Sequence, residues 1–405
     1  MCLQVIKYRY FHKRITRELL LSSCKIDAGA LFVLKAQMGR YYVGPVQFLV
    51  CYGAVVASTL LGGQSLKAIY VITLSTDGEG PVAPPLKLYA FVAIFGVLML
   101  VLAQIPSFHS LRHINLASIL LCLSYSVCAT AGSIYAGLLP PRRRGGPALR
   151  VLNALAIIAT TYGNGIIPEI QATAAPPVVG KMFKGLCLCY AVVIITFFSV
   201  ATSGYWAFGN LAQGSVLSNL LAGGSPLVPR WFLLMTNAFT LLQVSAVAVI
   251  YLQPTNDTLE GLFSDPKRDQ YSTRNMVPRL VFRSLAVATA TTIAAMLPFF
   301  GDINGFIGAF GFLPLDFVIP AIFYNATFRP SKRSLRFWGN AAIATVFSVM
   351  AVVASVAAVR QIVIDAKDYR LFANVEKIEN GDAVECRDYG EREKRDNSDV
   401  VSAGR

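Results

Sequence analysis

The sequence has little charge for its length. Lys, Arg, Asp and Glu make up 14% of the 405 residues, whereas soluble domains carry roughly 25%. Apolar residues make up 55%, and the mean hydropathy is +0.55. Several uninterrupted apolar runs are long enough for a helix to cross ~30 Å of hydrocarbon, which takes about 20 residues. The sequence therefore predicts an all-α, polytopic membrane protein in a lipid bilayer.

The sequence also lacks the patterns that hold metals or perform catalysis. Its eight cysteines include no C-x-x-C pair, so neither zinc nor a redox dithiol is indicated. His109 and His113 would share a helix face, but two histidines make a poor metal site. No nucleophile–base pair or phosphate-binding loop lies within the apolar runs. We therefore expect no catalytic residue, no metal, no cofactor and no enzyme.

Nine membrane spans are expected from the apolar runs. They cover about 43–72, 88–105, 114–137, 151–172, 186–208, 231–253, 280–300, 306–327 and 337–363. On this interpretation, residues 1–40 form a basic N-terminal segment and 41–364 form the transmembrane domain. Residues 365–405 form a charged tail whose composition favours disorder.

The net charge of +14 is interpreted as a topology signal rather than a nucleic-acid footprint. Lysine and arginine gather in the N-terminal segment and in alternate connectors. The positive-inside rule then places the N-terminus in the cytoplasm, and nine crossings place the C-terminus outside. The arginines at 142–144 lie in an outside connector and do not follow this rule.

One expected span contains the helix-breaking stretch TTYGNGIIPEIQ at 160–171. Pro168 has no N–H, and its ring would clash with the carbonyl of Asn164. Unpaired backbone groups cost several kcal/mol each in hydrocarbon, so the opened turn should border a cavity, a ligand or a polar helix. Such breaks bind polar solutes in transporters, which makes the candidate binding residues Thr160, Thr161, Tyr162, Gly163, Asn164 and Gly165. The alternative is a packing kink, with Glu169 near the cytoplasmic interface.

A second polar stretch, at 299–320, places Asp302 at the end of an apolar span and Asp316 within it. Ionisable groups inside a membrane are functional candidates, so Glu169 and Asp316 are candidates for proton or ion coupling. Asp316 has an equally open interpretation as a structural acid paired with a neighbour. The glycines that recur here every third residue predict close helix packing; they are Gly305, Gly308 and Gly311. Three residues of the first expected span are either cavity liners or packing residues, namely Tyr52, Ser58 and Thr59.

Several long motifs occur along the chain, namely DAGALFVLK (27–35), GRYYVGPVQ (39–47), LGGQSLKAIY (61–70), AQIPSFHSLRHIN (103–115), TTYGNGIIPEIQAT (160–173), GYWAFG (204–209), QPTNDTLE (253–260) and LPFFGDINGFIGAFGFLPLDFVIP (297–320). They resemble plant amino-acid permeases, in particular the GABA-transporter-like branch of the amino acid/auxin permease family. The resemblance implies an eleven-span carrier with the inverted five-plus-five repeat of the leucine-transporter fold. It also implies proton-coupled symport of amino acids or GABA, with protons as the coupling ion, at the plasma membrane. Thr160–Gly165 corresponds to the family's broken sixth helix.

The chain departs from the family pattern near its start. DAGALFVLK normally leads into the first span and GRYYVGPVQ into the third, yet only residues 36–38 join them here. The nine expected spans would then be family spans three to eleven, an incomplete form of the fold. Half of the implied substrate site would belong to the missing first helix. The alternative function is therefore a non-transporting protein that modulates full-length carriers by association.

The 405-residue chain is accordingly expected to transport poorly or not at all. Uptake of labelled GABA or amino acids in uptake-deficient cells should be far lower than for a version with the two family spans restored. Robust proton-dependent uptake by the chain alone would contradict this expectation. Uptake that changes only on co-expression with a full-length carrier would instead favour the modulator.

Overall fold

The computed structural model is helical throughout the part of the chain that it describes, and no strand occurs there. The described residues are 43–74, 86–104, 112–138, 158, 178–209, 212, 215–221, 227–263, 272–297, 300–328 and 330–367. The all-α class expected from the sequence is therefore confirmed.

The helices follow the expected spans in order. They are α3 (Gly44–Leu74), α4 (Leu88–Leu102), α5 (Arg112–Gly137), α8 (Val178–Phe208), the short α9 (Val216–Leu220), α10 (Arg230–Phe263), α11 (Thr273–Met296), α12 (Phe300–Phe306), the π-helix η4 (Ile307–Val318), α13 (Ile319–Phe328) and α14 (Leu335–Lys367). Seven segments in the described part are long and apolar enough to cross a membrane, and α4 is a shorter apolar helix. The expected span at 151–172 lies outside the described residues apart from Ile158, and the stretch 160–171 with it.

Three helix ends differ from the expected positions. α10 continues through Pro254 to Phe263 instead of ending at 253, because a neighbouring helix can support the turn that loses one N–H donor. α8 and α11 begin earlier than expected. Their early turns carry Lys184 and Arg274, both exposed. Long basic side chains keep their charge in water while their stems cover the helix. The helices can therefore begin before these residues.

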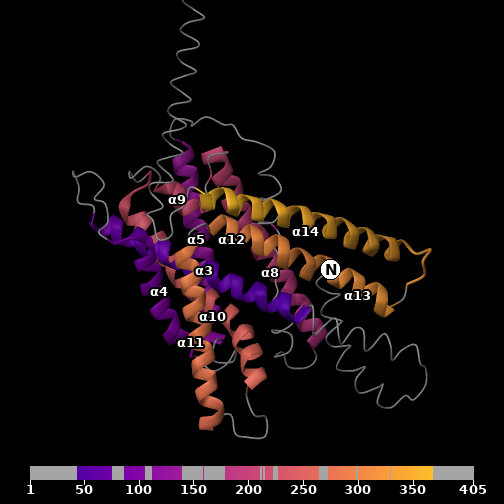
Figure 1. The fold of residues 1–405 in the computed structure, drawn as a ribbon. Coiled ribbons are helices and arrows are strands. Elements are labelled where there is room, and N and C mark those ends of the chain that lie inside the picture. The colour runs from indigo at the N-terminus through magenta and orange to yellow at the C-terminus, as the bar shows by residue number, and fades with distance from the viewer. Residues whose placement is uncertain are drawn as a thin grey trace, which may run out of the picture.

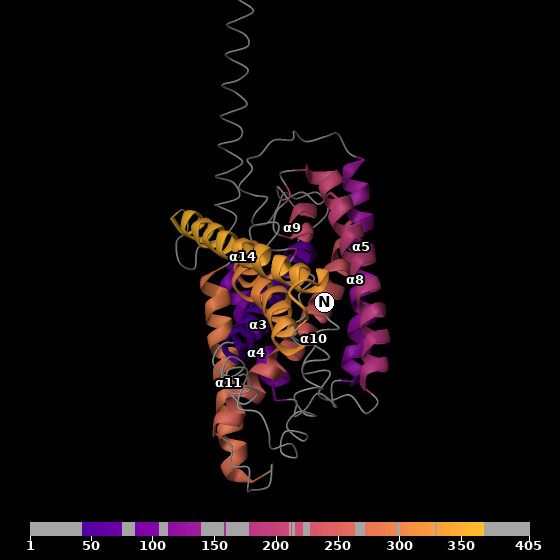
Figure 2. The same ribbon diagram turned by 90° about the vertical axis from the view of Figure 1, so that its right-hand side faces the viewer.

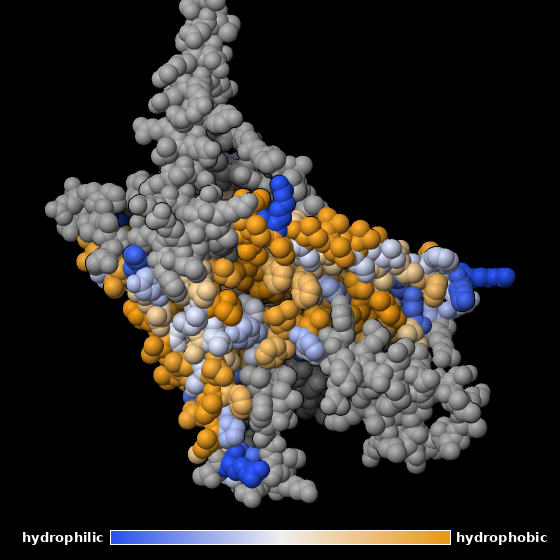
Figure 3. All heavy atoms as spheres, viewed as in Figure 1, coloured by the Kyte–Doolittle hydropathy of each residue, from blue (hydrophilic) through white to orange (hydrophobic). Residues whose placement is uncertain are grey.

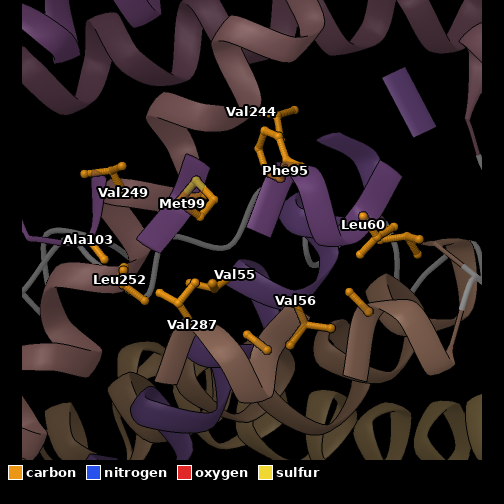
Figure 4. Close-up of a cluster of buried hydrophobic side chains, with 14 of the residues drawn as sticks. Val55, Val56, Leu60, Phe95, Met99, Ala103, Val244, Val249, Leu252 and Val287 are labelled. Carbon is orange, nitrogen blue, oxygen red and sulfur yellow. The ribbon is translucent and has the colours of Figure 1, made fainter. Parts of the chain in front are cut away.

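The central core of the molecule lies between α3, α4, α10 and α11 (Figure 4). α11 lies on one side of the molecule, and α5 and α8 run side by side on the other (Figure 2). α13 and α14 also lie side by side and cross the direction of α11 (Figure 1). The core is built from apolar side chains of all four helices: Val55, Val56 and Leu60; Phe95 and Met99; Val244, Val249 and Leu252; Val287 and Ala290.

The outer surface is also apolar, unlike that of a soluble protein. Hydrophobic residues cover most of the described surface in Figure 3, and hydrophilic ones gather at the ends of helices. Exposed apolar side chains line the outward faces of α8 and α14, among them Leu188, Ile195, Phe198, Val349, Val352 and Val356. Patches of this size on a soluble protein would mark an interaction site. On helices long enough to cross a bilayer, they are the surface that meets lipid.

Glycines allow the closest helix approaches within the core. A Cβ added to Gly63 of α3 would lie 2.8 Å from the Cα and 3.0 Å from the backbone nitrogen of Val92 in α4. Because the obstacle is main chain, no side-chain rotation can relieve the clash. Gly311 of η4 likewise faces the side chain of Val50 in α3. The close packing expected at Gly311 is therefore confirmed.

Substituting Gly63 by alanine should separate α3 from α4. We expect Gly63→Ala to lower the free energy of unfolding by about 1–3 kcal/mol, the usual cost of overpacking. Gly185→Ala in α8 is the matched control, because nothing lies within 4 Å of its added Cβ and alanine favours a helix by roughly 0.5–1 kcal/mol. Thermal unfolding of the detergent-purified variants measures both effects. Equal shifts in Tm for the two variants would contradict the close-contact explanation.

Candidate functional site

The candidate site begins where regular helical geometry gives way. η4 is a π-helix over Ile307–Val318, and it contains Pro314 and Asp316. Proline removes a backbone donor and crowds the carbonyl four residues back, and the wider turn of a π-helix relieves that crowding. π-turns are rare and are often found at functional sites. The polar stretch singled out in the sequence is therefore also the irregular segment of the described fold.

Asp316 brings three helices into one electrostatic neighbourhood. Its half-buried side chain interacts electrostatically with Tyr251 of α10, which in turn interacts with Cys51 of α3. Cys51 is completely buried. This brings an acid and a thiol within electrostatic range of one phenol, from helices α3, α10 and η4. These are proton-exchangeable groups, and none of them is a fixed positive charge.

Tyr251 was missed by sequence reasoning because its surroundings give no signal. It lies in the apolar run AVAVIYL, which reads as an ordinary membrane span. Only the packing of α10 beside α3 brings it into range of Asp316. The proximity of Pro254 three residues later is a weak signal that could have drawn attention to this part of α10.

The polar residues of α3 prove to be packing residues rather than cavity liners. The hydroxyl of Tyr52 donates to Oγ1 of Thr289 in α11 at 2.7 Å, and it therefore ties two helices together. Thr59 donates to the carbonyl of Val55 one turn back at 2.8 Å. Ser58 and Thr59 are both buried. Of the two interpretations open for these side chains, the structure supports packing.

α10 carries a column of buried polar side chains, most of which are satisfied locally. Thr236 donates to the carbonyl of Phe232 at 2.8 Å and Asn237 to that of Leu233 at 2.9 Å. Between helices, Ser118 of α5 donates to Oε1 of Gln243 at 3.0 Å. Such bonds make polar side chains tolerable inside a bilayer, where water cannot replace them. The buried members of the column are Thr236, Asn237, Thr240, Gln243, Gln253, Thr255 and Asn256.

Asn256 is the exception in this column. Its side chain is 1% exposed, yet neither its amide oxygen nor its amide nitrogen has a hydrogen-bond partner among the described residues. The buried amide oxygen of Gln64 in α3 likewise has no hydrogen-bond partner among the described residues. An unsatisfied buried polar group costs about 1–3 kcal/mol. A polar solute, an ion or water at these amides would offset that cost.

A buried arginine joins α11 to the end of α4. Arg283 is 1% exposed, and its Nη1 donates to the carbonyl of Ala103 at 3.0 Å. Ala103 follows the last residue of α4, where a helix has unsatisfied carbonyls and partial negative charge. Nearby, Nε2 of Gln104 is 3.5 Å from Oγ of Ser284. This cation therefore has a structural role as the cap of α4.

The roles predicted for the site residues remain predictions. The candidate binding residues Thr160–Gly165, Pro168 and Glu169 lie outside the described residues, so their roles stay predictions. Asp302 is buried in α12, and Asn304 donates to the carbonyl of Phe300 at 2.9 Å. Within the described part of the chain, no three His, Cys, Asp or Glu residues come together as metal ligands.

Comparison with known proteins gives one consistent result. The family model for transmembrane amino acid transporter proteins matches residues 28–361. The chain is 59% identical over 354 residues to a protein of Arabidopsis thaliana named GABA transporter 1, covering 85% of this chain and 77% of that protein. It is 30% identical over 354 residues to lysine histidine transporter-like 1 from the same plant, covering 84% and 75%. Lysine histidine transporter-like 6 is 30% identical over 362 residues, covering 86% and 78%. No solved structure matches significantly.

The unpartnered amide of Asn256 predicts an unusual effect on stability. Asn256→Leu should raise the unfolding free energy of the ligand-free protein by about 1–3 kcal/mol, because it removes a buried polar group with nothing to bond. Asn237→Leu is the matched control, since Asn237 is also 1% exposed but is hydrogen-bonded. It should lower stability by about 1 kcal/mol. Thermal unfolding in detergent measures both, and a loss of stability in Asn256→Leu would show that the amide is already paired.

Proposed function

The chain belongs to the transmembrane amino acid transporter family, and from this membership we propose that it carries GABA or related amino acids by proton-coupled symport. The observation that carries the proposal is the 59% identity to GABA transporter 1 over 354 residues. The family consists of transporters, so the chain is not an enzyme. It is an integral membrane protein. We further propose that it resides in the plasma membrane with its N-terminus in the cytoplasm.

The substrate site in this proposal is the interrupted helix at Thr160–Gly165, with Pro168 ending the break. An amino acid at neutral pH carries an ammonium and a carboxylate. The carbonyl and N–H groups freed by the break suit these two charges, because half-helix ends carry partial charges of both signs. The buried amides of Gln64 and Asn256 support a polar path along α3 and α10. They offer hydrogen-bonding groups that no described residue takes up.

The coupling site in this proposal is Asp316, with Glu169 as a second candidate. A carboxylate inside a membrane is costly when charged and much less so when protonated. Proton binding from outside would therefore lower the cost of moving η4 through a non-polar environment. Tyr251 lies within electrostatic range of Asp316 and is the candidate for exchanging a proton with it. Protons are the coupling ion, and no cofactor enters this scheme.

The test replaces the acid by its neutral isostere. Asp316→Asn should lower uptake driven by an inward proton gradient by about tenfold, because typical coupling free energies of about 1–3 kcal/mol correspond to changes of this size. Exchange of internal for external labelled GABA at equal pH should persist, since substrate binding is retained. Both are measured in the version with the two family spans restored, because the 405-residue chain alone is expected to transport poorly.

Asp302→Asn is the matched control, because it removes a buried carboxylate from the adjoining α12. It should keep the response to a proton gradient. If Asp316→Asn retains gradient-driven accumulation, Asp316 is not the coupling group. If it loses exchange as well, its role is structural.

A further inference from the structure

The corner between α13 and α14 concentrates positive charge. Four of the eight residues at 329–336 (RPSKRSLR) are basic, and no Asp or Glu occurs between Asp316 and Asp365. Lys332, Arg333 and Arg336 are exposed, and none of their side chains makes a hydrogen bond or ion pair with another described residue. Figure 3 shows hydrophilic residues at this end of α13 and α14, next to an apolar surface. The three charges are therefore available to an external anion.

Hydrogen bonds hold this corner in one shape. Nε1 of Trp338 donates to the carbonyl of Lys332 at 2.8 Å, which fixes the turn that carries the basic side chains. Nδ2 of Asn340 donates to Oδ1 of Asn325 at 2.9 Å, and Nδ2 of Asn325 donates to the carbonyl of Phe337 at 3.2 Å. The two asparagines thus clamp α13 to α14. Hydrogen bonds within the protein therefore hold the backbone that carries these charges.

Apolar side chains at the same corner set its depth in the membrane. Leu335 is 88% exposed and Trp338 is 62% exposed. Both lie in the first turn of a membrane-spanning helix. Tryptophan is enriched at the level of the lipid headgroups, where its ring is partly in hydrocarbon and partly in water. With Leu335 and Trp338 at this level, Lys332, Arg333 and Arg336 lie among the headgroups. A cluster of positive charges attracts a headgroup with a net negative charge more strongly than a zwitterionic headgroup.

We propose that the α13–α14 corner is a binding site for the headgroup of an anionic phospholipid. Guanidinium groups bind phosphate oxygens through paired, charge-assisted hydrogen bonds, and a lysine adds a point charge. Basic clusters directly beside a membrane helix favour anionic lipids by about 1 kcal/mol for each Lys or Arg. The clamp of the two asparagines and Trp338 lets the cluster select one lipid at a fixed place rather than attract a diffuse layer.

The test measures lipid selectivity of the full chain. The purified protein is reconstituted in phosphatidylcholine vesicles that contain either spin-labelled phosphatidylserine or spin-labelled phosphatidylcholine, and the motionally restricted fraction of each is compared. The triple variant Lys332→Gln, Arg333→Gln, Arg336→Gln should reduce the preference for phosphatidylserine by about tenfold or more. The double variant Lys332→Gln, Arg333→Gln should show a smaller loss in the same direction. Size-exclusion chromatography confirms that each variant is folded.

A charge-matched control separates a site from general basicity. Lys267→Gln, Arg268→Gln, Arg274→Gln removes the same charge from the sequence around the start of α11 and should leave the preference unchanged. Equal losses in the two triple variants, or no loss in either, would overturn the proposal. Inorganic phosphate added in excess should not displace the spin-labelled lipid, because the lipid is also held by its acyl chains. Displacement by phosphate would mean that the corner binds a free anion instead.

Discussion

The structure depends on one constraint: each polar group placed in hydrocarbon must find its partner within the protein. Backbone groups are satisfied by helices, which is why the described chain is all-helical. Thr236 and Asn237 satisfy their side chains one turn back in the same helix. The Tyr52–Thr289 and Ser118–Gln243 pairs satisfy theirs between helices and so align α3 with α11 and α5 with α10.

The places where this constraint is relaxed are the places where function is proposed. The π-helical turns of η4 exist at a cost in regular hydrogen bonding and carry Asp316. α10 buries an amide at Asn256 for which the described residues offer no partner. A transporter needs groups of this kind, because a polar solute must replace water with protein contacts while it crosses the bilayer. Stability and transport therefore make opposite demands on the same residues.

The sequence predicted the spans well because the physical signal is simple. A run of about 20 apolar residues has few alternatives to a membrane helix. The long described helices fall on expected spans, whereas the five-residue α9 lies between two of them. Helix ends were predicted less well, since Pro254 did not end α10 and basic residues did not delay the start of α8 and α11. Those ends depend on neighbouring helices and on the level of the headgroups, which local sequence does not encode.

The candidate site was predicted in part for the same reason. Asp316 is conspicuous as an acid within an apolar run, and a single sequence is enough to find it. Tyr251 comes within electrostatic range of Asp316 only in the folded chain, where α10 packs on α3 and α3 on η4. Asn256 gives no special signal in the sequence. It stands out in the structure because its buried amide has no hydrogen-bond partner among the described residues. The helix break at 160–171 is predicted from the glycines and the proline in that stretch. The stretch lies outside the described residues.

The short length of α4 has a consequence for the membrane itself. Its 15 residues span about 22 Å, less than the ~30 Å of an average hydrocarbon layer. The carbonyl of Ala103, directly after α4, accepts a hydrogen bond from the guanidinium of Arg283, which would otherwise have to come from water. A locally thinned bilayer would reduce the mismatch at a modest energetic cost. Bilayer thickness is therefore a physical variable that acts on α4 more than on the longer helices around it.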